Sequence, residues 1–512
     1  MKKIRTSAIG LCFWSIALQA QIDSTAIHYA STITANELNE HLHIIAADDY
    51  EGRETGYDGQ RKCEAYLIAQ YQQMGLPEVN GSYTQEFDLY LNDPSRVEVN
   101  ANGNEYTFLK DFYYYPATDD RTITSPLIFA GYGIDEEGYR DVDLPSVKDR
   151  IVIILSGEPM DDQGNYLLSG TKEASAWTTD GEKKKLLLEK NGAAAVVILY
   201  EDYDKRKKRV EGYFSHKTMS LAKDKEEVKG AMPVIHASLA MGQSMLGVKS
   251  WKKGMKALRK RKPINQGTSQ AEIVFKRKES RLTSSNVMGY IEGKEKREEL
   301  VVITAHYDHI GVDGEEVYNG ADDDGSGTVA TLEIAEAFAA AKAEGHGPQR
   351  SVLIVNVSGE EKGLLGSQYY VENPVFPLEN TVADLNIDMI GRVDEQHEGN
   401  ENYVYIIGAD RISQDLHDIG EAMNKNYCGL ELDYTFNAEE DPNRFYYRSD
   451  HYNFAKNGVP SVFYFSGVHE DYHQPGDTVD KIMFEKLERI TKLVFHTAWE
   501  LANRPERPIV NP

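Results

Sequence analysis

Five apolar runs in the second half of the chain constrain its fold more than any other feature. Each is rich in β-branched and aliphatic residues and lacks a regular alternation of polar side chains. They cover residues 300–305, 352–357, 382–390, 403–407 and 462–465. Strands of this kind are buried on both faces, which is typical of a mainly parallel sheet covered by helices.

Amphipathic stretches complete this pattern. Residues 327–343 and 483–501 show the helical period of apolar side chains. We therefore expect residues 271–512 to form the main part of an α/β domain, in which helices flank a mainly parallel mixed sheet.

The first half of the chain has a different organisation. Two helices are expected at 36–47 and 59–74, within a segment, 21–115, that we assign to the N-terminal part of the same domain. Apolar, β-rich runs follow at 127–134, 150–155, 193–200 and 234–236. No cluster with the spacing of metal ligands or nucleophiles occurs among them, so residues 116–270 are expected to be an inserted, β-rich, non-catalytic domain.

The N-terminus predicts export. The first five residues include three basic ones, an apolar run covers 8–18, and the small residue Ala20 follows. This is the pattern of a cleaved signal peptide over residues 1–20, so we expect a periplasmic or secreted protein. The apolar run is too short to cross a bilayer, and no membrane span is expected.

Charge and cysteine content restrict the partners further. The formal net charge of −26 becomes −29 once the three basic residues of the signal are removed, which disfavours nucleic acid and anionic membranes as partners. The basic stretch 251–262 is accordingly interpreted as a solvated helix end. Only Cys63 and Cys428 remain after processing, and the sequence leaves open whether they pair or stay free.

Side chains that bind metals follow the ends of the expected strands. They are His306 and Asp308, Glu360 and Glu361, and Asp388, with an aspartate triplet at 322–324 before a helix and His473 in a loop of turn-forming residues. His469 lies nearby, but the context of turn-formers favours His473 as the ligand. Two imidazoles and three carboxylates can hold two borderline cations and leave one carboxylate to move a proton. This is the composition of a two-metal hydrolase.

Several motifs, in order, resemble the co-catalytic dizinc aminopeptidases, whose relatives include the glutamate carboxypeptidase and transferrin receptor group. They are His-Tyr-Asp-His from His306, Gly-Ala-Asp-Asp-Asp-Gly-Ser-Gly from Gly320, Gly-Glu-Glu-Lys-Gly-Leu-Leu-Gly-Ser from Gly359, Asn-Ile-Asp-Met-Ile-Gly-Arg from Asn386, Ser-Asp-His from Ser449 and Tyr-His from Tyr472. Residues 51–56 are similar to the family's N-terminal segment. Short motifs at 131–133, 148–152 and 192–197 resemble the protease-associated domain that many members carry as an insertion.

The resemblance implies a phosphorylase/hydrolase-like zinc peptidase fold and two Zn²⁺, for which Co²⁺ or Mn²⁺ can substitute. One zinc would take His306 and Asp388, the other Glu361 and His473, and Asp323 would bridge them. Glu360 would be the general acid/base for a zinc-bridged water, and Asp308 would orient His306. Peptides would then be hydrolysed from the N-terminus. The family often has Asn where Asp322 stands, which leaves open which aspartate bridges.

Two other functions share parts of this pattern. A glutaminyl cyclase-type acyltransferase uses the same fold with one zinc, although the inserted domain argues against it. A non-catalytic binding protein like the transferrin receptor would be expected to have lost ligands, and none is missing here. The motifs also leave open dipeptidase or carboxypeptidase action, the side-chain preference and the oligomeric state.

Overall fold

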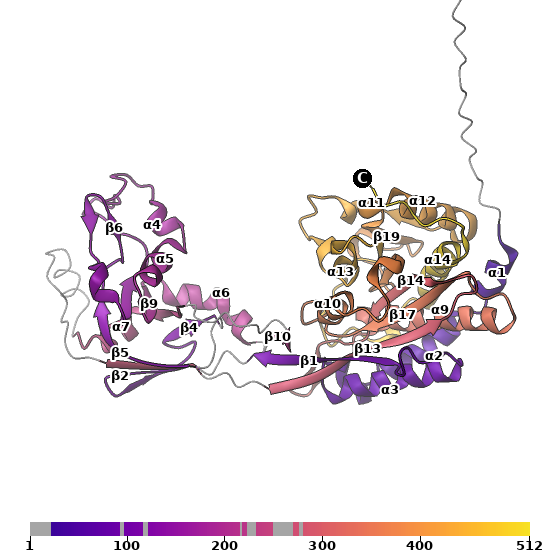
Figure 1. Cartoon of the computed structure of the whole chain (residues 1–512), viewed down its shortest axis with the longest axis horizontal. Helices are drawn as coiled ribbons and strands as arrows, with labels where there is room; N and C mark the ends of the chain where they lie inside the picture. The colour runs from indigo at the N-terminus through magenta and orange to yellow at the C-terminus, as the bar shows by residue number, and fades with distance from the viewer. Residues whose placement is uncertain are drawn as a thin grey trace, which may run out of the picture. The chain divides into compact units, whose positions relative to one another are not determined.

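The computed structural model describes residues 22–92, 97–115, 121–215, 218–222, 232–248, 270–275 and 280–511. The chain divides into a larger unit, formed by residues up to Phe87 and from Ser284 onward, and a smaller unit, Asp88–Thr283 (Figure 1). The expected signal peptide and the basic stretch 251–262 lie outside the described residues. Within the described ranges, no helix has the length and apolar content needed to cross a membrane.

The larger unit is built on one mixed sheet. Its strands are, in spatial order, β1 (Thr84–Asn92), β13 (Ser280–Ile291), β17 (Arg350–Val357), β14 (Lys296–His306), β18 (Thr381–Ile387), β21 (Ser461–Phe465), β19 (Tyr403–Ile407) and β20 (Glu431–Asp433). The central strands β17, β14, β18 and β21 run parallel, whereas β13 and β19 join them antiparallel. β10 (Thr218–Leu221) pairs with the end of β1 that belongs to the smaller unit. The predicted α/β fold with a mainly parallel mixed sheet is confirmed.

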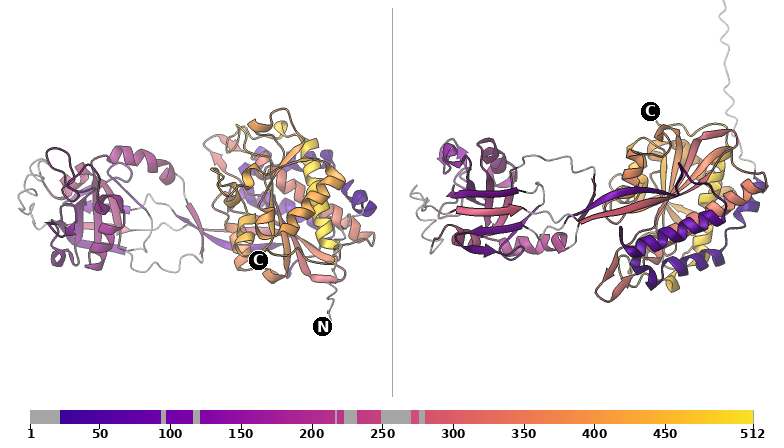
Figure 2. Two further views of the ribbon diagram at one scale, coloured as in Figure 1. Left: turned by 90° about the horizontal axis from the view of Figure 1, so that it is seen from above. Right: turned by 60° about the horizontal axis from the view of Figure 1, so that its bottom comes forward.

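Both faces of this sheet are buried, as the apolar runs predicted. Val301 and Ile303 of β14 point into a core that contains residues of α2 (Ala35–Ile45), α3 (Asp58–Gln73), α9 (Gly327–Ala343) and α14 (Phe484–Asn503). Leu300 and Val302 point to the opposite face, where α10 (Leu365–Glu372) and α13 (His451–Lys456) contribute to a second core. Figure 2 shows these two helical layers. The remaining α-helices and strands described in this unit are α1 (Ser24–Ala30), α11 (Ala409–Ile412), α12 (Gln414–Met423), β15 (Gly311–Asp313) and β16 (Glu316–Tyr318).

The smaller unit contains a second sheet. Its strands are, in spatial order, β3 (Asn104–Tyr106), β2 (Val97–Ala101), β12 (Gln270–Phe275), β5 (Arg121–Phe129), β8 (Ile151–Leu155), β9 (Ala195–Tyr200), β11 (Val234–Ser238) and β4 (Phe112–Tyr114). Among its described residues, the helices α4 (Ala176–Thr179), α5 (Lys183–Lys190), α6 (Tyr203–Ser215) and α7 (Leu239–Met245) accompany it, with a small hairpin of β6 (Asp135–Glu136) and β7 (Tyr139–Arg140). All four β-rich runs expected in the first half form strands of this sheet.

The limits of this unit differ from the expected 116–270. The difference arises because β2 and β12 pair with one another and β4 pairs with β11, so that segments on both sides of the expected domain belong to its sheet. Cys63 is buried in α3 and Cys428 is half-buried, and both thiols are free.

Helix α9 is buried on almost all sides, although its sequence suggested a single apolar side. It packs against the sheet, α2 and α14, and the small side chains of its alanines allow this close approach while favouring the helix. One consequence is the burial of Glu333, which is 2% exposed. Its Oε1 lies 3.5 Å from Nε2 of His41. Burial raises the pKa of the Glu333 carboxyl to about 8, and Glu37 and Glu336 add to the shift.

This buried carboxyl predicts a pH-dependent stability. From the unfolded pKa of 4.5 to the folded value of about 8, the native state binds the extra proton, so the free energy of unfolding decreases as the pH rises. The slope from this group is about 1.4 kcal/mol per pH unit and ends above the folded pKa. Glu333→Gln should remove this slope in urea unfolding series at pH 5 to 8, whereas Glu379→Gln, at an exposed position, should keep it. An unchanged slope in Glu333→Gln would contradict the assignment.

Candidate metal centre

Three neighbouring parallel strands bring the predicted ligands to one edge of the larger sheet. β14 ends at His306, and the pairing of His306 with Val357 places the end of β17 beside it. Glu360 and Glu361 follow β17, and Asp388 follows β18 on the other side of β14. Parallel strands share their carboxyl ends, so residues that are distant in sequence meet here, as is usual for ligand sites of open α/β sheets.

The aspartate triplet is divided between two tasks. Asp322 and Asp324 hold main-chain groups: Asp322 Oδ1 accepts the N–H of Gly391 at 2.6 Å, and Asp324 accepts the N–H groups of Met389 at 3.1 Å and His306 at 3.2 Å. Asp323 instead directs its carboxylate at two imidazoles. The middle position therefore faces the site, as the family resemblance implied.

Two groups of metal-ligating side chains share Asp323. In the first, His306 Nε2 lies 3.3 Å from Asp323 Oδ1 and 3.7 Å from Asp388 Oδ1. In the second, His473 Nε2 lies 3.1 Å from Asp323 Oδ2 and 3.2 Å from Glu361 Oε2. All five predicted metal ligands are thus in one place, and a carboxylate common to both groups can bridge two ions.

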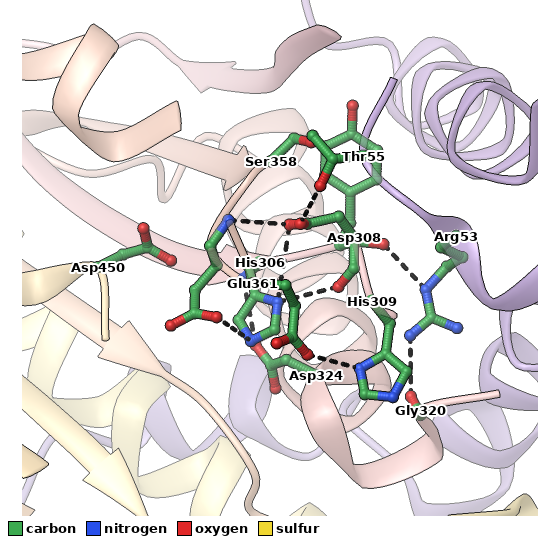
Figure 3. A network of polar contacts seen from close by, with 12 residues as sticks. Arg53, Thr55, His306, Asp308, His309, Gly320, Asp324, Ser358, Glu361 and Asp450 are labelled. Atoms are coloured by element: carbon green, nitrogen blue, oxygen red, sulfur yellow. Dashed lines mark hydrogen bonds and ion pairs between the residues drawn. The ribbon is translucent and has the colours of Figure 1, made fainter. Parts of the chain in front are cut away.

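His309 belongs to the second group, although it was not among the residues predicted from the sequence. Its Nδ1 lies 2.8 Å from Glu361 Oε1, and its side chain is completely buried (Figure 3). This imidazole stands three residues after His306 in the same motif, but that spacing alone does not identify it as a residue of the site. His469 lies apart from both groups: its Nε2 is 3.3 Å from Asp322 Oδ2, and its Nδ1 contacts Arg392.

Zinc suits this donor set. The buried atoms His306 Nε2 and Asp323 Oδ2 make no hydrogen bond to any described residue. Native proteins seldom leave buried polar atoms unsatisfied unless an ion or water occupies the site. Imidazole nitrogens and carboxylate oxygens are ligands that zinc accepts in catalytic sites.

Electrostatics separate the two adjacent glutamates. Burial and Asp323 act to raise the pKa of Glu361, but its contacts with His309 and His473 lower that pKa to about 2. Burial raises the pKa of Glu360 well above its usual range; His306 opposes this shift, and Glu361 adds to it. Glu360 Oε2 lies 3.9 Å from His306 Nε2. One neighbour is thus a stable anion and the other holds its proton more readily.

Asp308 contacts the imidazole of His306 through its main-chain oxygen. The Nδ1 atom of His306 lies 3.0 Å from the main-chain oxygen of Asp308, whereas the nearer carboxylate oxygen is 3.8 Å away. The carboxylate is engaged elsewhere, because Oδ2 accepts the hydroxyl of Thr55 at 2.6 Å and Oδ1 accepts the N–H of Glu360 at 3.3 Å. Asp308 therefore contacts both His306 and the segment of Glu360.

The Ser-Asp-His motif contributes a hydrogen bond to Asp388. Ser449 donates its hydroxyl to Asp388 Oδ2 at 2.7 Å and accepts the amide of Asn386 at 2.8 Å. Asp450 is fully buried and accepts the hydroxyl of Ser367 at 2.5 Å. Ser449 thus leaves Asp388 Oδ1 facing His306.

A pocket with polar and aromatic lining opens beside the two groups. Asp323, Glu360 and Asp388 form its polar side, and the rest of its lining consists of Met389, Phe445, Arg448, Phe463, Phe465, Val468 and Tyr472. The aromatic rings provide an apolar wall next to the candidate metal ligands.

The sequence matches a family of peptidases and several proteins named as aminopeptidases. Residues 286–498 match the model of peptidase family M28. A probable leucine aminopeptidase of Arthroderma otae is 32% identical over 214 residues, which are 40% of this chain and 55% of that protein. Aminopeptidase YwaD of Bacillus subtilis is 26% identical over 250 residues, or 47% of this chain and 50% of that protein. The chain spans about half the length of the curated relatives it matches.

Solved structures show the same fold. The aminopeptidase from Aneurinibacillus sp. strain AM-1 superposes with a TM-score of 0.51 at 19% identity, covering 95% of this chain and 98% of that one. The segment matched by the family model contains every side chain of the two candidate metal groups. The chain therefore carries a domain of peptidase family M28, as the resemblance of its motifs to the co-catalytic zinc aminopeptidases predicted.

Proposed function

We propose that this protein is an exported zinc aminopeptidase that removes N-terminal residues from peptides. The observation that carries the proposal is the pair of metal-ligating groups that share Asp323, beside a glutamate of raised pKa and a pocket with an aromatic wall. The names of the relatives support it, since those compared above are aminopeptidases. Export rests on the basic and apolar pattern of the N-terminus.

Two zinc ions fit the side chains that meet at the sheet edge. His306 and Asp388 would hold one, Glu361 and His473 the other, and Asp323 would belong to both. Bound there, zinc would polarise the scissile carbonyl and lower the pKa of the attacking water.

Glu360 would move the proton. Its burial raises the pKa of the carboxyl, and a base whose pKa lies closer to the working pH can both accept a proton from water and return it to the leaving amine. Glu361 contacts His309 and His473, whereas Glu360 lies near His306. The proton carrier and the metal ligand would therefore occupy different positions.

The surroundings suggest why the enzyme would act on chain ends. The carboxylates at the polar side of the pocket attract an α-ammonium group, and Phe445, Phe463 and Phe465 form a wall for the first side chain of the substrate. An apolar wall favours leucine or phenylalanine at the N-terminus over charged residues, whose desolvation costs free energy.

A substrate panel tests the activity and this preference. Leucyl and phenylalanyl anilides should be hydrolysed with a kcat/KM at least ~10-fold above that of alanyl, aspartyl and lysyl anilides, since each methylene in an apolar pocket contributes ~10-fold or more. Chelation should abolish turnover, and zinc should restore it with two ions per chain by mass spectrometry. One ion and no released amino acid would favour the cyclase reaction, and no ion would favour a binding protein.

A pair of variants tests the assigned roles. Glu360→Gln should retain both metals and lower kcat by ~10²- to 10⁴-fold, because the amide cannot accept the proton. His473→Ala should lose one metal, because it removes an imidazole from the second group. Activity assays and metal content on the same samples check both results. Normal hydrolysis by Glu360→Gln would show that another group is the base.

The hydrogen bond from Ser449 to Asp388 can be tested with a matched control variant. Ser449→Ala should weaken binding of one zinc by ~10- to 100-fold, as is typical when a hydrogen bond to a metal ligand is removed. Ser466→Ala is the control, since this serine is also buried but its hydroxyl bonds to no described residue. Dissociation constants from chelator competition should differ between the two variants; equal values would contradict the role of Ser449.

A further inference from the structure

The segment Glu51–Gly56 lies against the metal centre, although it is far from it in sequence. The N–H of His309 donates to the carbonyl of Arg53 at 3.2 Å. Gly52, at a φ of +59°, passes so close to the neighbouring chain that a Cβ there would lie 2.3 Å from the carbonyl oxygen of Tyr318. In Figure 3, Arg53 and Thr55 both contact the loop that follows His306. The fit is tight enough for this segment to fix the position of that loop.

Arg53 connects the two chain segments that carry His306 and Asp323. Its guanidinium is completely buried, and all its hydrogen bonds to described residues go to main-chain oxygens: Tyr307 at 2.9 Å, Asn319 at 2.6 Å, Gly320 at 2.9 Å and Ile45 at 2.9 Å. Tyr307 follows His306 directly, and Asn319 and Gly320 begin the loop of Asp323. Among the ion pairs of the described residues, none includes Arg53.

A buried cation without an anionic partner is costly. The planar guanidinium is suited to this position, because its five donors have a fixed geometry and can hold several carbonyls at set distances. The contacts of Arg53 therefore fix the separation between the end of β14 and the loop of Asp323. His306 and Asp323, which are 3.3 Å apart, depend on that separation.

Thr55 acts on the same loop through Asp308. Its hydroxyl donates to Asp308 Oδ2 at 2.6 Å, and the other carboxylate oxygen accepts the N–H of Glu360 at 3.3 Å. The main-chain oxygen of Asp308 lies 3.0 Å from His306 Nδ1. A single hydroxyl thus holds the residue that contacts both a predicted metal ligand and the predicted base.

We propose that Arg53 and Thr55 are positioning residues of the metal centre, which set the geometry of His306, Asp323 and Glu360 without touching metal or substrate. This inference rests on the proposed zinc site. It gives a role to the motif at residues 51–56, which the ligand set does not use.

Thr55 provides the sharper test, because its shape and its hydroxyl can be separated. Thr55→Val keeps the shape and removes the donor, whereas Thr55→Ser keeps the donor. In the full-length mature protein, zinc dissociation constants from chelator competition should rise by ~10- to 100-fold in Thr55→Val and stay near wild type in Thr55→Ser. The absorption spectrum of the Co²⁺-loaded protein should change in Thr55→Val alone.

Thr491→Val controls for the loss of a buried hydroxyl. Thr491 is also fully buried, and its hydroxyl donates to Leu487 within α14 at 2.7 Å. This variant should keep the zinc affinity and the Co²⁺ spectrum. Measurements at a temperature where near-UV circular dichroism shows every variant folded separate metal binding from stability.

Arg53→Lys tests the second contact, because an ammonium keeps the charge but cannot reach all the carbonyls that the guanidinium holds. Where it folds, it should weaken zinc binding by ~10-fold or more. Wild-type zinc affinity and Co²⁺ spectrum in Thr55→Val would overturn the inference while leaving the proposed function intact. A wild-type protein that bound neither zinc nor cobalt would overturn the proposed function and this inference with it.

Discussion

The parallel alignment of β17, β14 and β18 is the constraint on which the rest of the structure depends. Because their carboxyl ends share one edge, His306, Glu361 and Asp388 meet there with Asp323. So many buried carboxylates in one place repel one another, and their desolvation is unfavourable without cations. The stability of the sheet, which is buried on both faces, allows the chain to hold these groups together. The electrostatic cost is therefore concentrated where ions can offset it.

Main-chain contacts hold the loops that carry the ligands. The carboxylate of Asp477 accepts the N–H groups of Asp322 at 3.0 Å and Asp323 at 3.1 Å, and Asp324 fixes the N–H of Met389 directly after Asp388. Arg53 performs the complementary task, since its guanidinium donates to carbonyls of the same loop. Anionic side chains thus bind the donors of the backbone and a cationic one binds its acceptors.

The sequence was sufficient for those parts that depend on local pattern. The continuous apolar runs predicted the strands, and helix boundaries near α2, α3, α9 and α14 followed from apolar periodicity and from the glycine and proline after α3. The limits of the smaller unit did not follow, because β2, β4 and β12 enter its sheet through pairing between segments distant in sequence. Periodicity within a strand carries no information on its partner.

The candidate site shows the same division. Strand ends and motifs located the five predicted ligands that meet in the two candidate metal groups. His309 was missed because its position after His-x-Asp does not show whether the ring belongs to the metal centre or only packs in the core. Its 2.8 Å approach to Glu361 in the structure shows that it belongs to the metal centre. The sequence also did not predict that the main-chain oxygen of Asp308 contacts His306. The carboxylate of Asp308 accepts the hydroxyl of Thr55 instead.

What decides the role of each carboxylate is the set of donors around it. Asp322 and Asp324 accept main-chain N–H groups and so serve the loops. The second oxygen of Asp322 lies 3.3 Å from His469, which is apart from the two candidate metal groups. Asp323 and Glu361 face the imidazoles of those groups, and each has a buried oxygen without a hydrogen bond to the described residues, so their remaining capacity is available to a cation. Glu360 differs from these four, because burial raises the pKa of its carboxyl and its nearest imidazole nitrogen is 3.9 Å away. The surroundings of each acidic residue therefore decide whether it holds a loop, faces a cation or carries a proton. A linear motif does not specify those surroundings.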